Sequence, residues 1–335
     1  MHMKRLLFLV LFFTIMPLSG CSSLQVLDPK GPVAKLQENL FQLSTGIMIL
    51  VFITVFSMFV IFTWKYRETP ERRDVTPAYV KGNRKYEIAW TVIPIILLLI
   101  LAVPTVQGTF SLSDSQEKED GKMEITVTGH QYWWEFHYSD EGITLSNEVW
   151  IPVDTPVVFK LKSDDVIHSF WVPQLGGKKD LNPGGTNPNR LTLHASETGV
   201  YEGKCAELCG ASHSLMRFKV HAVSKEKYDE WISDKQEDRA PEAAASDSYE
   251  KGKKLFTSNC LSCHADGYTE KRDGPNLAGI GRKDYIASVI PNSEANMKKW
   301  IKDPKSFKPG AKMPGFGDLS DEELEALADY LSNLK

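Results

Sequence analysis

The sequence predicts a multidomain membrane protein, with a two-helix transmembrane hairpin, an all-β domain and a small all-α domain. Two uncharged apolar runs, at about residues 40–64 and 88–110, each exceed the ~20 residues that cross a bilayer. Residues 122–223 contain short segments rich in Val, Ile, Thr and aromatic residues, separated by Gly, Pro, Asn and Asp, which predicts strands. Residues 249–335 have helical patterns instead. The length of 335 residues allows two or three domains, and a net charge of −4 gives no indication of nucleic-acid binding.

The N-terminus has the features of an export signal. Lys4 and Arg5 precede an apolar core, and the segment closes with small residues, so residues 1–20 are predicted to be a signal peptide. The ending Leu-Ser-Gly-Cys at residues 18–21 resembles a bacterial lipoprotein box, which implies that Cys21 is lipidated and anchored in membrane lipid. The alternatives are an ordinary signal, or a third membrane span with an incidental cysteine.

The loop between the two apolar runs decides the predicted topology. Residues 65–87 are rich in Lys and Arg, and positively charged loops remain in the cytoplasm. Both ends of the hairpin are therefore expected outside, with everything after about residue 108 extracytoplasmic. We expect a lipidated N-terminus and hairpin over 21–110, a β domain over 111–235 that ends in a helix at 224–235, a polar linker over 236–248 and a helical domain over 249–335. Ser320 with Glu323 three residues later predicts a capped final helix.

The C-terminal domain carries a motif for covalent heme attachment. Cys260 and Cys263 are separated by two residues and followed by His264, the C-x-x-C-H pattern of c-type heme. A thioredoxin-like dithiol is the alternative, but it requires a βαβ context that this region lacks. The second axial ligand is Met313 or Met297, because methionine with histidine is the cytochrome c ligation pattern. Lys-Met-Pro-Gly-Phe at 312–316 and Gly-Pro-Asn-Leu at 274–277 resemble loops of class I cytochromes c, a likeness that spans residues 249–335 and favours Met313.

The β domain contains a second sulfur-rich loop, GKCAELCGASHSLM, at 203–216. A disulfide would leave the histidine and methionine of this loop unexplained, and methionine is a poor ligand for structural zinc. Thiolate, imidazole and thioether together favour copper. Two thiolates on one loop can bridge two coppers, and a second histidine must then come from elsewhere. His168 is the outstanding candidate among the β-domain histidines, in Val-Ile-His-Ser-Phe at 166–170.

These two segments together resemble the binuclear copper centre of subunit II of cytochrome c oxidases, and the resemblance covers roughly residues 25–230. It implies a cupredoxin-like fold for the β domain and, with the C-terminal domain, the type of subunit II that carries its own cytochrome c. The implied copper ligands are the side chains of His168, Cys205, Cys209, His213 and Met216 and the backbone carbonyl of Glu207. The Glu207 side chain is implied to reach a magnesium or manganese ion shared with subunit I.

The resemblance also implies roles outside the two cofactor sites. Tyr132, Trp133 and Trp134 match the aromatic segment where electrons enter, although the first position is Tyr where the family has Trp; core aromatics are the alternative. Glu87 matches a glutamate at the mouth of a proton pathway, and a merely interfacial carboxylate is the alternative. Asp180 matches a family acid. Arg190 is the equivalent of a family arginine, although its segment is longer than usual.

The implied function is electron entry into a proton-pumping oxidase of the bacterial plasma membrane. A cytochrome c or cytochrome bc-type complex would reduce heme c, and the electron would pass to copper and then to subunit I, where oxygen becomes water. An electron-entry subunit of a nitric oxide reductase with the same copper motif is the alternative. The hairpin and heme motif argue against a nitrous oxide reductase, and the fused heme argues against a copper carrier. Bound copper would exclude a quinol oxidase subunit.

Overall fold

The computed structural model describes residues 26–73, 76, 79–117, 123–185, 187–236, 246–270 and 272–334. The predicted lipidation residue Cys21 and most of the predicted linker lie outside these ranges. The described residues form two compact units: residues 35–117 are one, and residues 26–34 with those between 123 and 334 are the other. The predicted fold class is confirmed, with two apolar helices, a β-sandwich and a mainly helical C-terminal domain. The predicted domain boundaries remain predictions.

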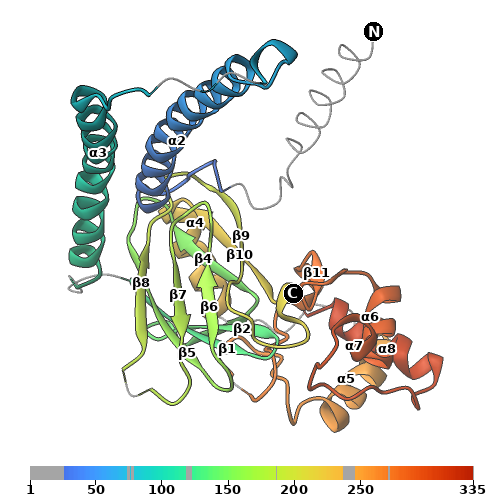
Figure 1. The fold of residues 1–335 in the computed structure, drawn as a ribbon. Coiled ribbons are helices and arrows are strands. Elements are labelled where there is room, and N and C mark those ends of the chain that lie inside the picture. Colours follow the sequence, from blue (N-terminus) through green and yellow to red (C-terminus); the bar gives the residue numbers. More distant parts are fainter. Residues whose placement is uncertain are drawn as a thin grey trace. The chain divides into compact units, whose positions relative to one another are not determined.

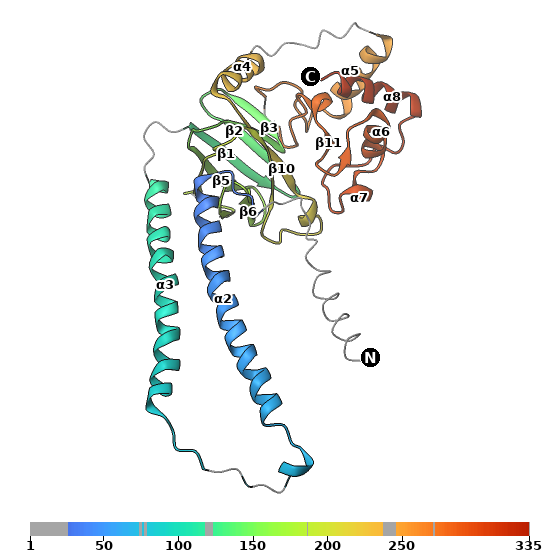
Figure 2. The ribbon, with the colours of Figure 1, turned by 90° about the horizontal axis from the view of Figure 1, so that it is seen from above.

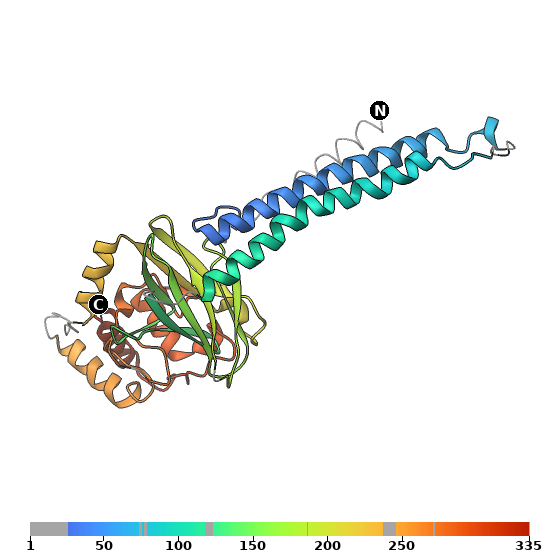
Figure 3. The same ribbon diagram turned by 90° about the vertical axis from the view of Figure 1, so that its left-hand side faces the viewer.

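The first unit is a helical hairpin. It consists of α2 (Pro32–Lys65), the short 3₁₀ helix η3 (Pro70–Arg72) and α3 (Arg84–Glu117). The long helices run side by side (Figure 3), and a side chain at Gly108 of α3 would lie 3.3 Å from Leu36 of α2. Both are long and apolar enough to span a membrane, with mean hydropathies of 2.6 and 2.5 in their most apolar windows. Each helix extends beyond its predicted apolar run, because polar residues continue the helix at its ends.

The β domain is a sandwich of two five-stranded sheets (Figure 1), ordered β3-β2-β1-β5-β8 and β4-β10-β9-β6-β7. The strands are β1 (Met123–His130), β2 (Trp133–Tyr138), β3 (Ile143–Ser146), β4 (Glu148–Pro152), β5 (Val157–Ser163), β6 (His168–Trp171), β7 (Lys178–Leu181), β8 (Asn189–Leu193), β9 (Gly199–Cys205) and β10 (Arg217–Val223). The 3₁₀ helix η4 (His213–Leu215) precedes β10, and α4 (Lys225–Gln236) follows it, close to the predicted helix at 224–235.

A dense aromatic core joins the two sheets. The rings of Phe170 and Phe218 stack at 4.8 Å between centroids, and the buried Trp134 packs edge-on against both. Gly203 is needed beside this core, because a Cβ there would lie 2.1 Å from the Phe218 ring. Large aromatic side chains bury the most apolar area per residue, so this cluster fixes how the sheets face each other.

The C-terminal domain is mainly helical (Figure 2). It contains α5 (Asp247–Asn259), η5 (Ile280–Arg282), β11 (Tyr285–Ile286), β12 (Ile290–Pro291), α6 (Glu294–Lys302), α7 (Pro304–Phe307) and α8 (Asp321–Ser332). The tiny β11–β12 hairpin is an addition to the predicted all-α architecture. Helices α5 and α8 pack through the rings of Phe256 and Tyr330, 5.3 Å apart. The predicted cap is present, since the Ser320 side chain accepts from the Glu323 amide and the Glu323 carboxylate accepts from the Ser320 amide.

Candidate electron-transfer site

Strand pairing brings His168 to the sulfur-rich loop, although 37 residues separate it from Cys205. Strand β6 lies against β9, with Phe170 opposite Cys205, and the Ala206 amide donates to the Ser169 carbonyl at 2.9 Å. The Cys205 amide also donates to the Met216 carbonyl at 3.0 Å, which closes the loop on itself. The start of β6, the end of β9 and the start of β10 therefore meet at one corner of the sandwich.

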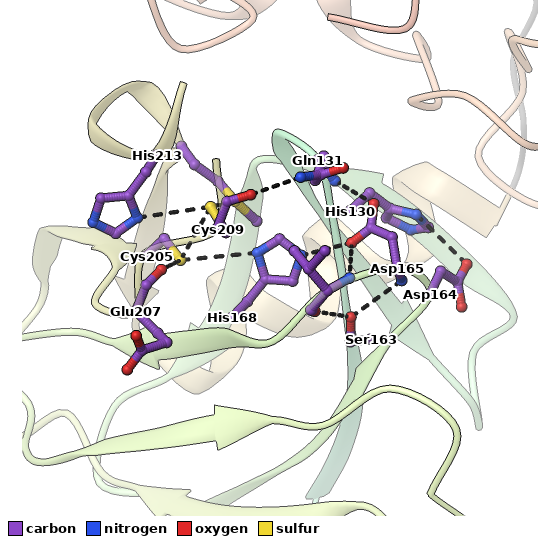
Figure 4. Close-up of polar contacts among 12 residues, drawn as sticks. His130, Gln131, Ser163, Asp164, Asp165, His168, Cys205, Glu207, Cys209 and His213 are labelled. Atoms are coloured by element: carbon purple, nitrogen blue, oxygen red, sulfur yellow. Dashed lines mark hydrogen bonds and ion pairs between the residues drawn. The ribbon is translucent and has the colours of Figure 1, made fainter. Parts of the chain in front are cut away.

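The predicted ligand side chains form a continuous cluster there (Figure 4). Cys205 Sγ lies 3.8 Å from His168 Nδ1 and 3.8 Å from Cys209 Sγ. Cys209 Sγ lies 3.7 Å from His213 Nδ1 and 3.8 Å from Met216 Sδ. Both cysteines are free thiols rather than a disulfide. The ligand atoms of His168, Cys205 and Cys209 all lie within 4.8 Å of one another, close enough to hold a metal ion.

The second thiol raises the acidity of the first. The two sulfurs lie 3.8 Å apart, and this contact lowers the pKa of Cys205 despite its burial, while the same contact and burial raise the pKa of Cys209. Because metals bind thiolate, a pair that readily gives up a proton is already prepared for metal binding. The Glu207 carbonyl also faces this sulfur, 3.2 Å from Cys205 Sγ, whereas the Glu207 side chain is exposed.

Asp165 orients the buried histidine, a role that the sequence reasoning missed. The His168 ring is fully buried and its Nε2 lies 2.8 Å from an Asp165 oxygen (Figure 4). Because a carboxylate can only accept, Nε2 carries the proton and Nδ1 presents its lone pair to the cysteines. Burial opposes ionisation of Asp165, but hydrogen bonds from His168, the Gln131 amide, the Val166 amide and Lys312 lower its pKa to about 2. The signal available in the sequence was an acid three residues before the histidine.

The aromatic segment braces the sulfur-rich loop from the other sheet. The Tyr132 hydroxyl accepts from the Ala211 amide at 3.0 Å, and the Gln131 side chain donates to the Cys209 carbonyl at 2.6 Å. Trp134 is fully buried in the core, with its ring centroid 6.0 Å from that of His168. Trp133 is half-buried and stacks on His130 at 4.1 Å. Gln131 was not among the predicted site residues.

The heme-attachment motif lines a cavity of about 530 Å³. Cys260, Cys263, His264 and Met313 all border it, as do apolar side chains from the helices around it and Met297. His264 Nδ1 donates to the Pro275 carbonyl at 2.8 Å, which leaves Nε2 free for a metal, and burial lowers the pKa of this imidazole. Burial raises the pKa of Cys260 to about 11. An apolar cavity bordered by two thiols, an imidazole and a thioether fits a c-type heme.

Two hydrogen bonds join the methionine loop to the sulfur-rich corner. The Ser212 hydroxyl donates to the Pro309 carbonyl at 2.6 Å, and Lys312 Nζ lies 3.2 Å from Asp165. Asp165 therefore contacts both His168 and the residue that precedes Met313.

Three predicted residues belong to neither of these clusters. Glu87 is in the first turn of α3. Asp180 is exposed on β7, and Arg190 on β8 lies 3.7 Å from Glu124. Neither Asp180 nor Arg190 borders the cavity or touches the cysteines among the contacts that the structure describes.

Three family models match the chain in succession. They are the transmembrane domain of cytochrome c oxidase subunit II at residues 21–107, its periplasmic domain at 141–223, and cytochrome c at 249–335. The subunit II family indicates copper and the cytochrome c domain indicates heme.

Curated relatives match almost the whole chain. A cytochrome c oxidase subunit 2 of Alkalihalophilus pseudofirmus is 45% identical and covers 98% of this chain and 96% of its own length. One from Bacillus sp. strain PS3 is 41% identical, with coverages of 95% and 94%. A probable quinol oxidase subunit 2 of Staphylococcus saprophyticus is 38% identical over 68% of this chain and 59% of its own length.

Proposed function

Because this chain belongs to the cytochrome c oxidase subunit II family and is thus a subunit of an oxidoreductase complex, we propose that it is the electron-entry subunit of a proton-pumping oxidase. Electrons would enter at the C-terminal domain, pass through the sulfur-rich corner of the sandwich, and leave to subunit I, where oxygen is reduced to water. The single observation that carries this proposal is the direct contact between the two candidate cofactor sites, through Lys312 and Asp165.

The sulfur-rich corner would hold two coppers. His168, Cys205, Cys209, His213 and Met216 would supply side-chain ligands, and Glu207 its carbonyl, a donor set of thiolate, imidazole and thioether that suits copper. Burial of both sulfurs and the hydrogen bonds that close the loop support a rigid site. A rigid site needs little reorganisation when its charge changes.

The C-terminal cavity would hold heme c, with Cys260 and Cys263 as its covalent attachment points. His264 and Met313 would be the axial ligands. Bound copper and heme would supply one-electron redox chemistry, and this chain's residues would orient them and exclude water. The Lys312–Asp165 ion pair and the Ser212–Pro309 hydrogen bond would hold the two sites together, so that electron transfer does not wait for diffusional encounter.

Three further roles belong to the proposal. Tyr132 and Trp133 both border the heme cavity, and Tyr132 also holds the sulfur-rich loop. These positions support an entry role for this segment, whereas Trp134 packs in the core. The exposed Glu207 carboxylate would bind magnesium or manganese together with subunit I, as hard cations favour oxygen ligands. Glu87 would lie at the entrance of a proton pathway.

We place both redox domains on the extracytoplasmic side of the bacterial plasma membrane. The two apolar helices and the basic loop between them support this orientation, and lipid attached to Cys21 would add a second anchor. The partners would be subunit I, other oxidase subunits and an upstream cytochrome c or cytochrome bc-type donor.

Replacement of Cys205 by Ser tests the electron path. In the purified complex, Cys205→Ser should abolish the near-infrared copper band, leave the heme c spectrum intact and stop oxygen uptake driven by reduced heme c. Ser214→Ala, an exposed change on the same loop, is the control and should leave all three unchanged. Normal oxygen uptake in Cys205→Ser would refute the proposed order, and consumption of nitric oxide in place of oxygen would identify the alternative enzyme.

A further inference from the structure

The heme cavity contains a buried lysine that the electron-transfer function does not use. Lys308 follows α7 and borders the same cavity as His264 and Met313. Only 4% of its surface is exposed, in contrast to the other lysines of this segment, Lys305 and Lys312, which are exposed. A buried ammonium is costly unless an opposite charge accompanies it.

The contacts of this ammonium leave its charge uncompensated. Lys308 Nζ donates one hydrogen bond, to the Ala287 carbonyl at 2.9 Å, although an ammonium has three donors. Among the residues that the structure describes, no carboxylate forms an ion pair with it. Glu148, Glu202 and Asp273 border the cavity elsewhere. Burial lowers the pKa of Lys308 to about 7, and the interaction with Cys209 opposes this shift without reversing it.

The loop that carries Lys308 also carries the candidate iron ligand. The Ala311 amide donates to the Lys308 carbonyl at 3.0 Å, and Gly310 adopts a positive φ of 80°, so the loop turns back between Lys308 and Met313. The ammonium and the thioether therefore border one cavity from a single turn. A heme that receives Met313 on its iron brings its own negative charges into this space, because it carries two propionate carboxylates.

We propose that the Lys308 ammonium forms an ion pair with a propionate carboxylate of the heme bound in this cavity. The pair supplies the missing counter-charge for Lys308 and neutralises a negative charge beside the iron. A cation next to the heme stabilises the added electron by direct Coulomb attraction, more strongly in a buried site than in water. Lys308 is thus a positioning and potential-setting residue. The proposal rests on heme c being bound, as proposed above.

The test is the heme midpoint potential of the purified full-length complex near neutral pH. Lys308→Gln keeps a donor for the Ala287 carbonyl and Lys308→Met does not, but both remove the charge. Both should shift the reduced-to-oxidised ratio at fixed potential toward the oxidised form by about tenfold, which is about 59 mV for one electron. Lys305→Gln on α7 is the matched exposed control and should leave the potential unchanged.

Each of the following outcomes would refute the proposed ion pair between Lys308 and a propionate. An unchanged potential in Lys308→Gln, or a shift only in Lys308→Met, assigns Lys308 a structural hydrogen bond alone. A shift confined to the copper signals would mean that Cys209 and its loop, rather than a propionate, balance the charge of Lys308. If the variants lose heme, the ion pair is tested in the unmodified reduced protein by solid-state NMR, with ¹⁵N-labelled lysine and heme ¹³C-labelled at its propionates. Absence of a dipolar coupling between the Lys308 nitrogen and a propionate carbon would refute the ion pair. Absence of covalent heme from the unmodified protein would instead refute the proposed function.

Discussion

Gly129 on β1 offers the sharpest test of how the fold holds the candidate copper site. A Cβ at this position would lie 2.8 Å from Cδ2 and 3.0 Å from Cγ of His168, and 3.2 Å from Leu181. The histidine ring cannot retreat easily, because it is fully buried and hydrogen-bonded to Asp165 at 2.8 Å. Gly129→Ala should therefore displace His168 from Cys205 or break its bond to Asp165.

The expected magnitude follows from overpacking in a buried site. Insertion of one methyl group against an immobile ring costs about 1–3 kcal/mol. For a domain of roughly 200 residues, about 2 kcal/mol lowers the melting temperature by about 4–8 °C. Loss of an orienting hydrogen bond to a metal ligand weakens metal binding by about 10–100-fold.

The assay is copper titration of the full-length protein, followed through the near-infrared band, together with thermal unfolding. Gly185→Ala is the control, because a Cβ there meets its nearest neighbour, the Asn187 carbonyl, only at 3.8 Å. Wild-type copper affinity and an unaltered band in Gly129→Ala would refute the assignment of His168 as a ligand held against β1.

Three further predictions concern the C-terminal domain. Met313→Ala should lower the heme potential, because thioether ligation raises it; an unchanged potential, with a shift in Met297→Leu instead, would make Met297 the ligand. Ser320→Ala should cost about 1 kcal/mol of stability by removing the α8 cap. Hydrogen bonds from Ser320 lower the pKa of Glu323, so its stabilisation is present at neutral pH and is lost as the pH falls below the usual value of 4.5. Acid unfolding of Glu323→Gln should lack this contribution, and an identical pH profile would contradict it.

Much of the architecture was predictable because its signals are local. Apolar length predicts the spanning helices, and alternating strands with turn residues predict the sandwich. The capping box of α8 is encoded within four residues, and the structure contains it. The motifs at 203–216 and 260–264 bring their chemistry within a few residues, so the kinds of cofactor follow from residue type and spacing.

The contacts between distant segments could not be predicted in the same way. Asp165 lies only three residues from His168, yet another of its partners, Lys312, is 147 residues away. Gln131 reaches the Cys209 carbonyl across 78 residues. Strand register and side-chain burial create such contacts, and neither quantity is a property of a short sequence window.

The sequence by itself thus determined the membrane hairpin, the order of the domains and the two sulfur-containing motifs, since each depends on neighbouring residues in the chain. Only the tertiary structure decided that His168 meets Cys205 with its Nδ1, that Gly129 leaves room for its ring, and that Lys308 is buried beside the heme cavity. Pairing of β6 with β9 places His168 beside Cys205, and packing of the C-terminal domain around its cavity buries Lys308. The GKCAELCGASHSLM loop has most of the donor atoms, but the sandwich brings its two cysteines together with His168.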